Sequence, residues 1–147
     1  MHKSALLCLT ALACLLPLGL PTLAADGASD KELFQGTWVC VVTLKDGQAV
    51  ETYVGVRAKF EGETLTWYFP QKDGSYREQK NSYRIDSSKN PKHFDWWVAD
   101  KTPISPDFRL FTVSKDMLRF STNLDYKTRP ATFESGKWQF TCKRVIK

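Results

Sequence analysis

Two short segments at opposite ends of the chain have matching strand patterns, and this match restricts the fold more than any other feature. Residues 36–42 and residues 138–144 both alternate in the manner of β-strands. One antiparallel register opposes three pairs of residues: Trp38 with Arg144, Cys40 with Cys142, and Val42 with Phe140. Alternate side chains of a strand point to one face, so all six would share a side. A first strand that pairs with the last predicts a sheet closed into a barrel.

The first 25 residues have the layout of a secretory signal peptide. Lys3 precedes an apolar run, and the small residues Thr22 and Ala24 suit cleavage after Ala24 or Ala25. Pro17 ends the apolar run well short of the roughly 20 residues that span a bilayer, so a transmembrane anchor is disfavoured. We therefore expect export to the periplasm or the extracellular space, and one mature domain over residues 26–147.

The four cysteines also bear on the compartment. A lipoprotein signal with Cys14 as the lipidated residue is disfavoured, since Ala stands three positions earlier, where Leu is usual. Removing the signal discards Cys8 and Cys14 and leaves Cys40 and Cys142, an even number in an oxidising compartment. These two face each other in the predicted register, so a disulfide is somewhat favoured over two buried thiols.

The charges do not indicate a nucleic-acid partner. The chain has 21 Lys and Arg against 16 Asp and Glu, for a net charge of +5. Both signs are interspersed along the sequence, whereas nucleic-acid binders usually gather basic residues on one face. We expect a soluble, mixed surface.

Beyond residue 36, apolar residues recur at every second position, and turn residues interrupt this pattern at short intervals. Before it, Ser29 and Glu32 have the spacing of a capping box, which predicts one helical turn across an end of the barrel. Further strands are expected over residues 50–60, 65–69, 76–86, 93–98, 108–113 and 117–121, with a final strand pair within 131–146. About eight antiparallel strands without a long helix predict an all-β, up-and-down barrel.

Five segments, in order along nearly the whole mature chain, carry a family resemblance: residues 34–38, 59–66, 86–95, 118–120 and 129–133. With them the chain resembles an uncharacterised lipocalin-like domain family abundant in planctomycete bacteria. The resemblance implies a lipocalin-like barrel but no catalytic residues, because that family has no established activity. Gly36 and Trp38 with the late Arg144 are also similar to the wider lipocalin pattern, in which an Arg packs over the Trp at the closed end.

Two features depart from the family pattern. The Cys40 and Cys142 pair is not typical of it, and Ser121 stands where many relatives carry Cys. The loop over residues 99–107 is also shorter than usual. Because loops at the open end would select a ligand or partner, function does not follow from the family.

Little in the sequence favours catalysis. His93 is the only histidine left after cleavage, and we expect it to be exposed and without a catalytic role. Asp95 shares its face, but without a second His or a Cys pair of metal spacing we expect no metal site. No carboxylate falls on an inward face in this phasing, so the acid pair of a glycosidase is not predicted. We expect neither an enzyme nor a bound cofactor.

The many aromatic residues leave the interior of the barrel undecided. Those expected to point inward are Trp38, Trp67, Phe69, Phe94, Trp96 and Phe120. A barrel of about eight strands can be filled by such side chains or can hold one small ligand. Tyr53, Tyr68 and Trp97 are expected on the outer face.

A candidate binding site follows from three polar residues with inward phase. Arg77, Gln79 and Asn81 alternate with the phase of Tyr83 and Ile85, yet burying them without partners would cost about 1–3 kcal/mol per group. We therefore place them at a wet, open end. An aromatic floor that includes Trp67 and Trp96 would lie below them. This arrangement favours a ligand with an apolar body and a polar or anionic head, such as a fatty acid.

Two functions remain equally favoured. The first is a secreted binding module that holds a small apolar or amphipathic molecule in the barrel. The second is an interaction protein, such as an inhibitor or envelope component, with a filled barrel and loops that dock a protein partner. A cavity of about 300 Å³ or more would favour the first.

Overall fold

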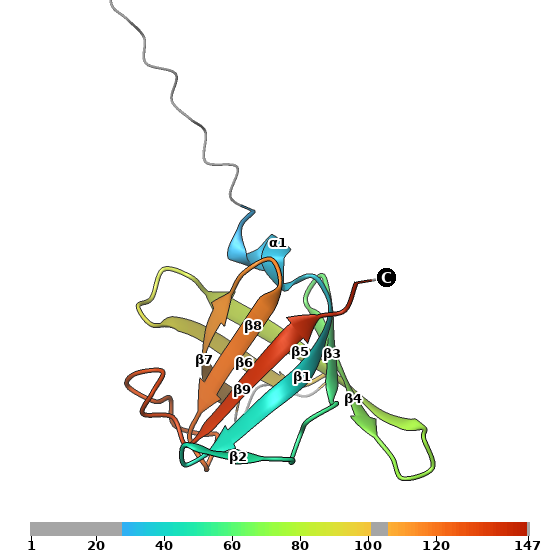
Figure 1. The fold of residues 1–147 in the computed structure, drawn as a ribbon. Coiled ribbons are helices and arrows are strands. Elements are labelled where there is room, and N and C mark those ends of the chain that lie inside the picture. Colours follow the sequence, from blue (N-terminus) through green and yellow to red (C-terminus); the bar gives the residue numbers. More distant parts are fainter. Residues whose placement is uncertain (1–27, 101–105, 147) are drawn as a thin grey trace, which may run out of the picture.

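The computed structural model describes residues 28–100 and 106–146, and the predicted signal peptide lies outside these residues. A single sheet of antiparallel strands curls into a barrel, and a short helix, α1 (Asp30–Phe34), lies over one end of it (Figure 1). The strands are β1 (Gly36–Lys45), β2 (Gln48–Val50), β3 (Arg57–Glu61), β4 (Thr64–Pro70), β5 (Tyr76–Asp86), β6 (Lys92–Val98), β7 (Asp107–Val113), β8 (Met117–Thr122) and β9 (Trp138–Arg144). No helix in the described part of the chain has the length and apolarity to cross a membrane.

The predicted barrel is confirmed. Strands β3 to β8 each pair with the next strand in sequence, and β1 pairs with both β3 and β9, which closes a ring of eight strands. The remaining strand, β2, forms a short hairpin with the end of β1. We call the end covered by α1 the closed end, and the opposite one, where β2 lies, the open end (Figure 1).

The closing register is correct for two of the three predicted pairs. Trp38 pairs with Arg144 and Cys40 with Cys142, but Val42 pairs with Thr141, and Phe140 faces Thr43. The register shifts between Cys40 and Val42, as in a β-bulge, where one strand carries an extra residue and bends. The shift turns Val42 outward and buries Thr43.

The predicted continuous strand over residues 50–60 is wrong. Residues 51–55 form turns between β2 and β3, and Tyr53 and Gly55 both have positive φ. The Cys40 N–H donates to the Val56 carbonyl, and the Gly55 N–H donates to the Cys40 carbonyl. After this turn, the chain hydrogen-bonds to β1 again only at Cys40, next to the bulge. This path places residues 53–56 near the open end.

The predicted strand pair within residues 131–146 is also wrong, because only β9 forms there. Residues 131–135 form bends and turns, and the Ser121 hydroxyl donates to the Phe133 carbonyl at 2.6 Å. This contact holds the segment against the outside of β8. Part of the predicted loop at 99–107, residues 101–105, lies outside the described residues.

At the closed end, α1 supplies a plug for the barrel. The capping box forms as predicted: the Glu32 N–H donates to the Ser29 hydroxyl, and the Ser29 N–H donates to the Glu32 carboxylate. The helix then drives Phe34 into the core, where it is fully buried, with its ring 5.0 Å from that of Phe60 and 4.9 Å from that of Phe111. A helix of five residues is not stable in isolation, so the packing of Phe34, rather than helix propensity, stabilises α1.

The Trp38 and Arg144 pair seals the same end. The Arg144 guanidinium lies 4.1 Å from the centre of the Trp38 ring, and the Trp38 indole donates to the Phe34 carbonyl at 2.9 Å. Gly36 has a φ of +108°, and a Cβ there would lie 3.0 Å from Arg144 Nη1. The Gly-x-Trp pattern thus leaves room for the Arg that covers the Trp.

Candidate ligand-binding cavity

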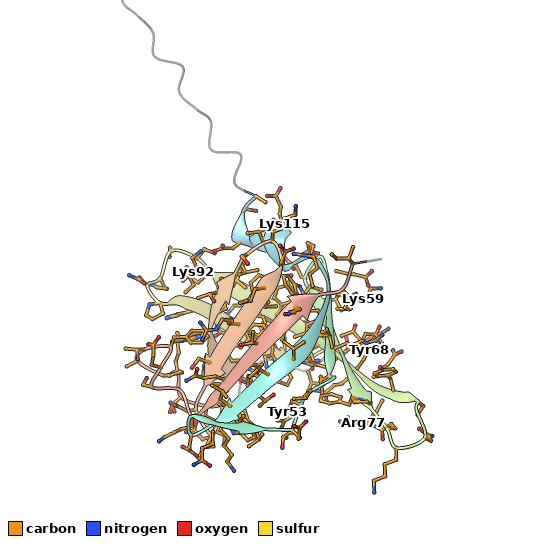
Figure 2. The ribbon with its side chains drawn as sticks, in the orientation of Figure 1. Tyr53, Lys59, Tyr68, Arg77, Lys92 and Lys115 are labelled. Carbon is orange, nitrogen blue, oxygen red and sulfur yellow. The ribbon has the colours of Figure 1, made fainter. Side chains whose placement is uncertain are left out.

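The interior is hollow toward the open end, where a cavity of about 420 Å³ lies inside the sheet. Half of the residues that line it are aromatic, among them Trp67, Phe69, Trp96 and Phe140. Figure 2 labels Tyr53 and Arg77, two further lining residues, away from α1, and Lys115 beside α1. The fully buried residues Phe34, Phe60, Phe94 and Phe111 at the closed end take no part in this lining. The barrel is therefore filled at one end and open to a small molecule at the other.

A buried ion pair stands in the cavity wall. Asp107 and Arg109 are two residues apart on β7, so their side chains share the inward face. Arg109 Nε and Nη2 donate to the Asp107 carboxylate at 3.0 and 2.9 Å, and the two side chains are only 8% and 12% exposed. This bidentate pair leaves the Nη1 hydrogens of Arg109 without an acceptor among the described residues.

Aromatic rings surround the Arg109 guanidinium. Its central carbon lies 5.2 Å from the ring centre of Phe140, 5.7 Å from that of Trp96 and 6.0 Å from that of Trp67. Burial acts to lower the pKa of Arg109, but attraction and hydrogen bonds from Asp107 outweigh it and raise that pKa above its usual value. The cavity therefore presents a permanent cation with donors to spare in an apolar setting.

Two further donors belong to the tryptophans of the predicted floor. Trp67 and Trp96 both line the cavity, and their rings meet edge to face at 6.4 Å. Neither indole N–H has a hydrogen-bond acceptor in the described part of the chain, although both nitrogens are buried. An unsatisfied buried donor costs about 1–3 kcal/mol.

Two of the three polar residues predicted for the open end line the cavity, and the third does not. Arg77 and Gln79 both line the cavity, and the exposed Arg77 guanidinium packs 4.4 Å from the centre of the Phe69 ring. Asn81 is instead 1% exposed, and its amide donates to the Gln79 carbonyl at 2.9 Å. The Gln79 side-chain amide donates in turn to Asn81 Oδ1 at 3.1 Å, so Asn81 is satisfied within the barrel wall and does not lie at a wet rim.

Tyr53 does not lie on the outer face, as the sequence pattern predicted. The positive φ of the turn brings its side chain to the cavity, where its ring lies 5.6 Å from those of Trp138 and Phe140. Burial and the neighbouring Tyr53 raise the pKa of Tyr126, another lining residue, to about 12. The Tyr126 hydroxyl stays protonated at neutral pH.

The other two aromatic residues expected on the outer face, Tyr68 and Trp97, are half-buried.

Cys40 and Cys142 also line the cavity, on the seam between β1 and β9. Both are buried free thiols in the structure, so the disulfide stays a prediction. The Cys40 sulfur lies 3.4 Å from the Thr43 hydroxyl, the residue that the bulge turns inward.

The remaining candidates for chemistry are occupied or isolated. His93 is half-buried, and burial together with the nearby Arg129 lowers its pKa, so its imidazole is neutral at pH 7. Asp95 is buried between two guanidinium groups, with Arg84 Nε at 2.9 Å and Arg129 on its other oxygen. Within residues 28–100 and 106–146, no group of three or more potential metal ligands gathers.

Sequence reasoning missed Asp107 and Arg109, and it wrongly placed no carboxylate on an inward face. On β7 one phase contains Asp107 and Arg109 together with the apolar Phe111 and Val113. The other phase contains the apolar Phe108 and Leu110, so periodicity could not decide which phase points inward. The segment after β8 covers this outer face: Arg129 lies over the Phe108 ring at 5.1 Å. The signal that was present is an Asp and an Arg two residues apart on one strand, which share a face in either phase.

Comparison with known proteins identifies the fold and nothing finer. No protein-family model matches the sequence, and no curated protein matches it. Among solved structures, the barrel is similar to the crystal structure of a lipocalin-like protein from Bacteroides uniformis, with a TM-score of 0.57 and 11% sequence identity. The match covers 77% of this chain and 99% of that one. The chain therefore has a lipocalin-like fold.

Proposed function

We propose that this protein is an exported, non-enzymatic binding protein whose barrel holds one small molecule with an apolar body and an anionic head. The observation that carries the proposal is the aromatic cavity of about 420 Å³ with the buried Arg109 in its wall. Cavities that bind small molecules run from about 300 to 1,000 Å³, and a few well-placed polar groups in them orient the ligand. Membership of the uncharacterised family that the sequence resembles is part of this proposal.

Two guanidinium groups divide the recognition of the ligand between them. Arg77 is exposed at the cavity edge, where solvent and salt screen its charge, so it serves mainly to attract an anion. Arg109 is desolvated, and a charge-assisted hydrogen bond to its Nη1 would be strong there. We place the anionic head at Arg109 and the apolar body against the rings of Trp67, Trp96 and Phe140.

The competing function, a filled barrel that docks a protein through its loops, has less support. It needs an interior closed by side chains, whereas only the closed end is packed in this way. At the hollow end, Arg109 Nη1 has no acceptor among the described residues, and a sealed core would not need such a donor.

The experiment is a titration of the mature chain with a fluorescent fatty acid. We expect saturable binding with one site per chain. The informative variant is the double change Asp107→Leu with Arg109→Met, because removing Arg109 alone would leave an uncompensated buried carboxylate at a cost of about 3–5 kcal/mol. Replacing both charges by apolar side chains is often neutral for stability, so the fold should persist while affinity falls at least about tenfold.

Two single variants complete the design. Arg77→Ala should weaken binding less than the double variant, and chiefly at low salt. Lys143→Ala, an exposed position on β9, should bind like the wild type. The absence of saturable binding by the wild type, or a double variant that binds unchanged, contradicts the proposal. Native mass spectrometry of protein purified from its own host would then identify any molecule that co-purifies.

A further inference from the structure

The two cysteines face each other at the seam that closes the barrel. The Cys40 backbone bonds to Gly55 and Val56 on the side away from β9, so Cys40 and Cys142 form a pair without mutual backbone hydrogen bonds. In such antiparallel pairs the Cα atoms are about 4.5 Å apart, which lies within the 4.4–6.8 Å that disulfides span. That spacing is compatible with a bond between the two sulfurs.

The surroundings make the two thiols unequal. Hydrogen bonding with Cys142, Thr43 and the Val42 backbone, together with the charge of Arg109, lowers the pKa of Cys40 to about 7. Hydrogen bonding to Cys40 and burial raise the pKa of Cys142. The thiolate is the nucleophile in disulfide chemistry, and the Thr43 hydroxyl 3.4 Å from the Cys40 sulfur can donate to it, so we assign Cys40 as the attacking sulfur and Cys142 as the one that resolves.

Among the described residues, both cysteines are buried and line the ligand cavity, so the cavity is the route by which a reagent would reach their sulfurs. Cys40 is 3% exposed and Cys142 is 2% exposed, and both residues line the cavity together with Val56 and Arg109. A reagent must therefore enter where a ligand would lie. We propose that Cys40 and Cys142 form a thiol–disulfide exchange site in the cavity wall, which accepts small disulfides and is closed by a bound ligand. The second half of this proposal rests on the proposed function.

The exchange takes two steps. The Cys40 thiolate attacks one sulfur of a small disulfide, RSSR, which forms a mixed disulfide and releases RS⁻. Cys142 then loses its proton to RS⁻ or to solvent and attacks the Cys40 sulfur, which forms the Cys40–Cys142 bond and releases the second RS⁻. The protein dithiol loses two electrons, and RSSR is reduced to two thiols, so the balance closes without a metal or another cofactor.

The first test uses the reduced, folded mature chain without ligand, treated with hydroxyethyl disulfide and followed by mass spectrometry. The wild type should lose two hydrogens and keep no adduct. Cys142→Ser should trap a mixed disulfide at Cys40, whereas Cys40→Ser should react at least tenfold more slowly. Equal rates for the two variants would overturn the assignment of Cys40. Thiols that react only after denaturation would overturn the exchange site as a whole.

The second test asks whether the cavity is the route. Val56→Phe places a ring into the cavity beside the two sulfurs and should slow oxidation at least tenfold, while the outer-face variant Lys143→Ala should not. An unchanged rate in Val56→Phe would refute access through the cavity. Saturating fluorescent fatty acid should protect the thiols in the same way. Fatty acid that binds without protecting them would refute closure by the ligand, and failure to bind would count against the proposed function alone.

Discussion

The two ends of the barrel are built from the same strands but are filled in different ways. At the closed end a helix outside the sheet contributes Phe34, whose ring packs among those of Phe60, Phe94 and Phe111. At the open end no helix of the described residues enters, and the inward residues of β7 there are the charged pair Asp107 and Arg109. The comparison shows that strand number alone does not decide whether a barrel is hollow. In this barrel, the end that is filled is the one where an element outside the sheet, α1, contributes a side chain to the interior.

An arginine at each end shows the same contrast. Arg144 stands over the rim of the closed end, where each of its three nitrogens donates to a carbonyl, of Leu33, Gln35 or Lys115. Arg109 lies inside the open end, where among the described residues its Nε and Nη2 donate to Asp107 and its Nη1 has no acceptor. The first arrangement stabilises the fold, and the second suits recognition of a ligand.

The largest effect is expected at the plug. Phe34→Ala should lower the free energy of unfolding by about 3–5 kcal/mol, because the other rings cannot collapse into the space it leaves. Urea denaturation of the mature chain, compared with the wild type, measures this loss. A loss below about 1 kcal/mol would show that the closed end does not depend on α1, and the contrast between the ends would fail.

A smaller effect is expected at the seal over Trp38. Arg144→Ala should lower the free energy of unfolding by about 2–3 kcal/mol, since it removes the cation from the indole face and three charged hydrogen bonds. The control is Lys143→Ala, an exposed neighbour on β9, which should stay within about 0.5 kcal/mol of the wild type. Equal losses in the two variants would mean that the contacts of Arg144 contribute nothing particular to the closed end.

The smallest effect is expected when a Phe side chain is introduced at either of two positions that are two residues apart, one at each end of the barrel. Ala58 is 1% exposed in the packed core opposite Trp38, so Ala58→Phe should destabilise the fold by about 1–3 kcal/mol through overpacking. Val56 lines the cavity, so Val56→Phe should change stability by less than about 1 kcal/mol and weaken fatty-acid binding at least about tenfold. Thermal unfolding and the fluorescence titration give the two readouts. A stability loss in Val56→Phe equal to that in Ala58→Phe would argue that the open end is packed as tightly as the closed one.

Several parts of the fold could be predicted from residue spacing in the sequence. The capping box of α1 needs only Ser29 and Glu32, three residues apart. The closure of the barrel follows from the pairing of Trp38 with Arg144 and of Cys40 with Cys142, because side chains that must share one buried face fix the register. These features depend on spacing, which the sequence states directly.

At the open end, the direction of the side chains was decided by tertiary structure. The bulge after Cys40 reverses the predicted facing of Val42 and Thr43, and the turn over residues 51–55 brings Tyr53 inward. The phase of β7 places Arg109 inside only because the segment after β8 covers its other apolar face. Period-two patterns assume an uninterrupted strand with one wet face. Where an extra residue, a positive φ or a covering segment removes that condition, the direction of a side chain depends on contacts between distant parts of the chain.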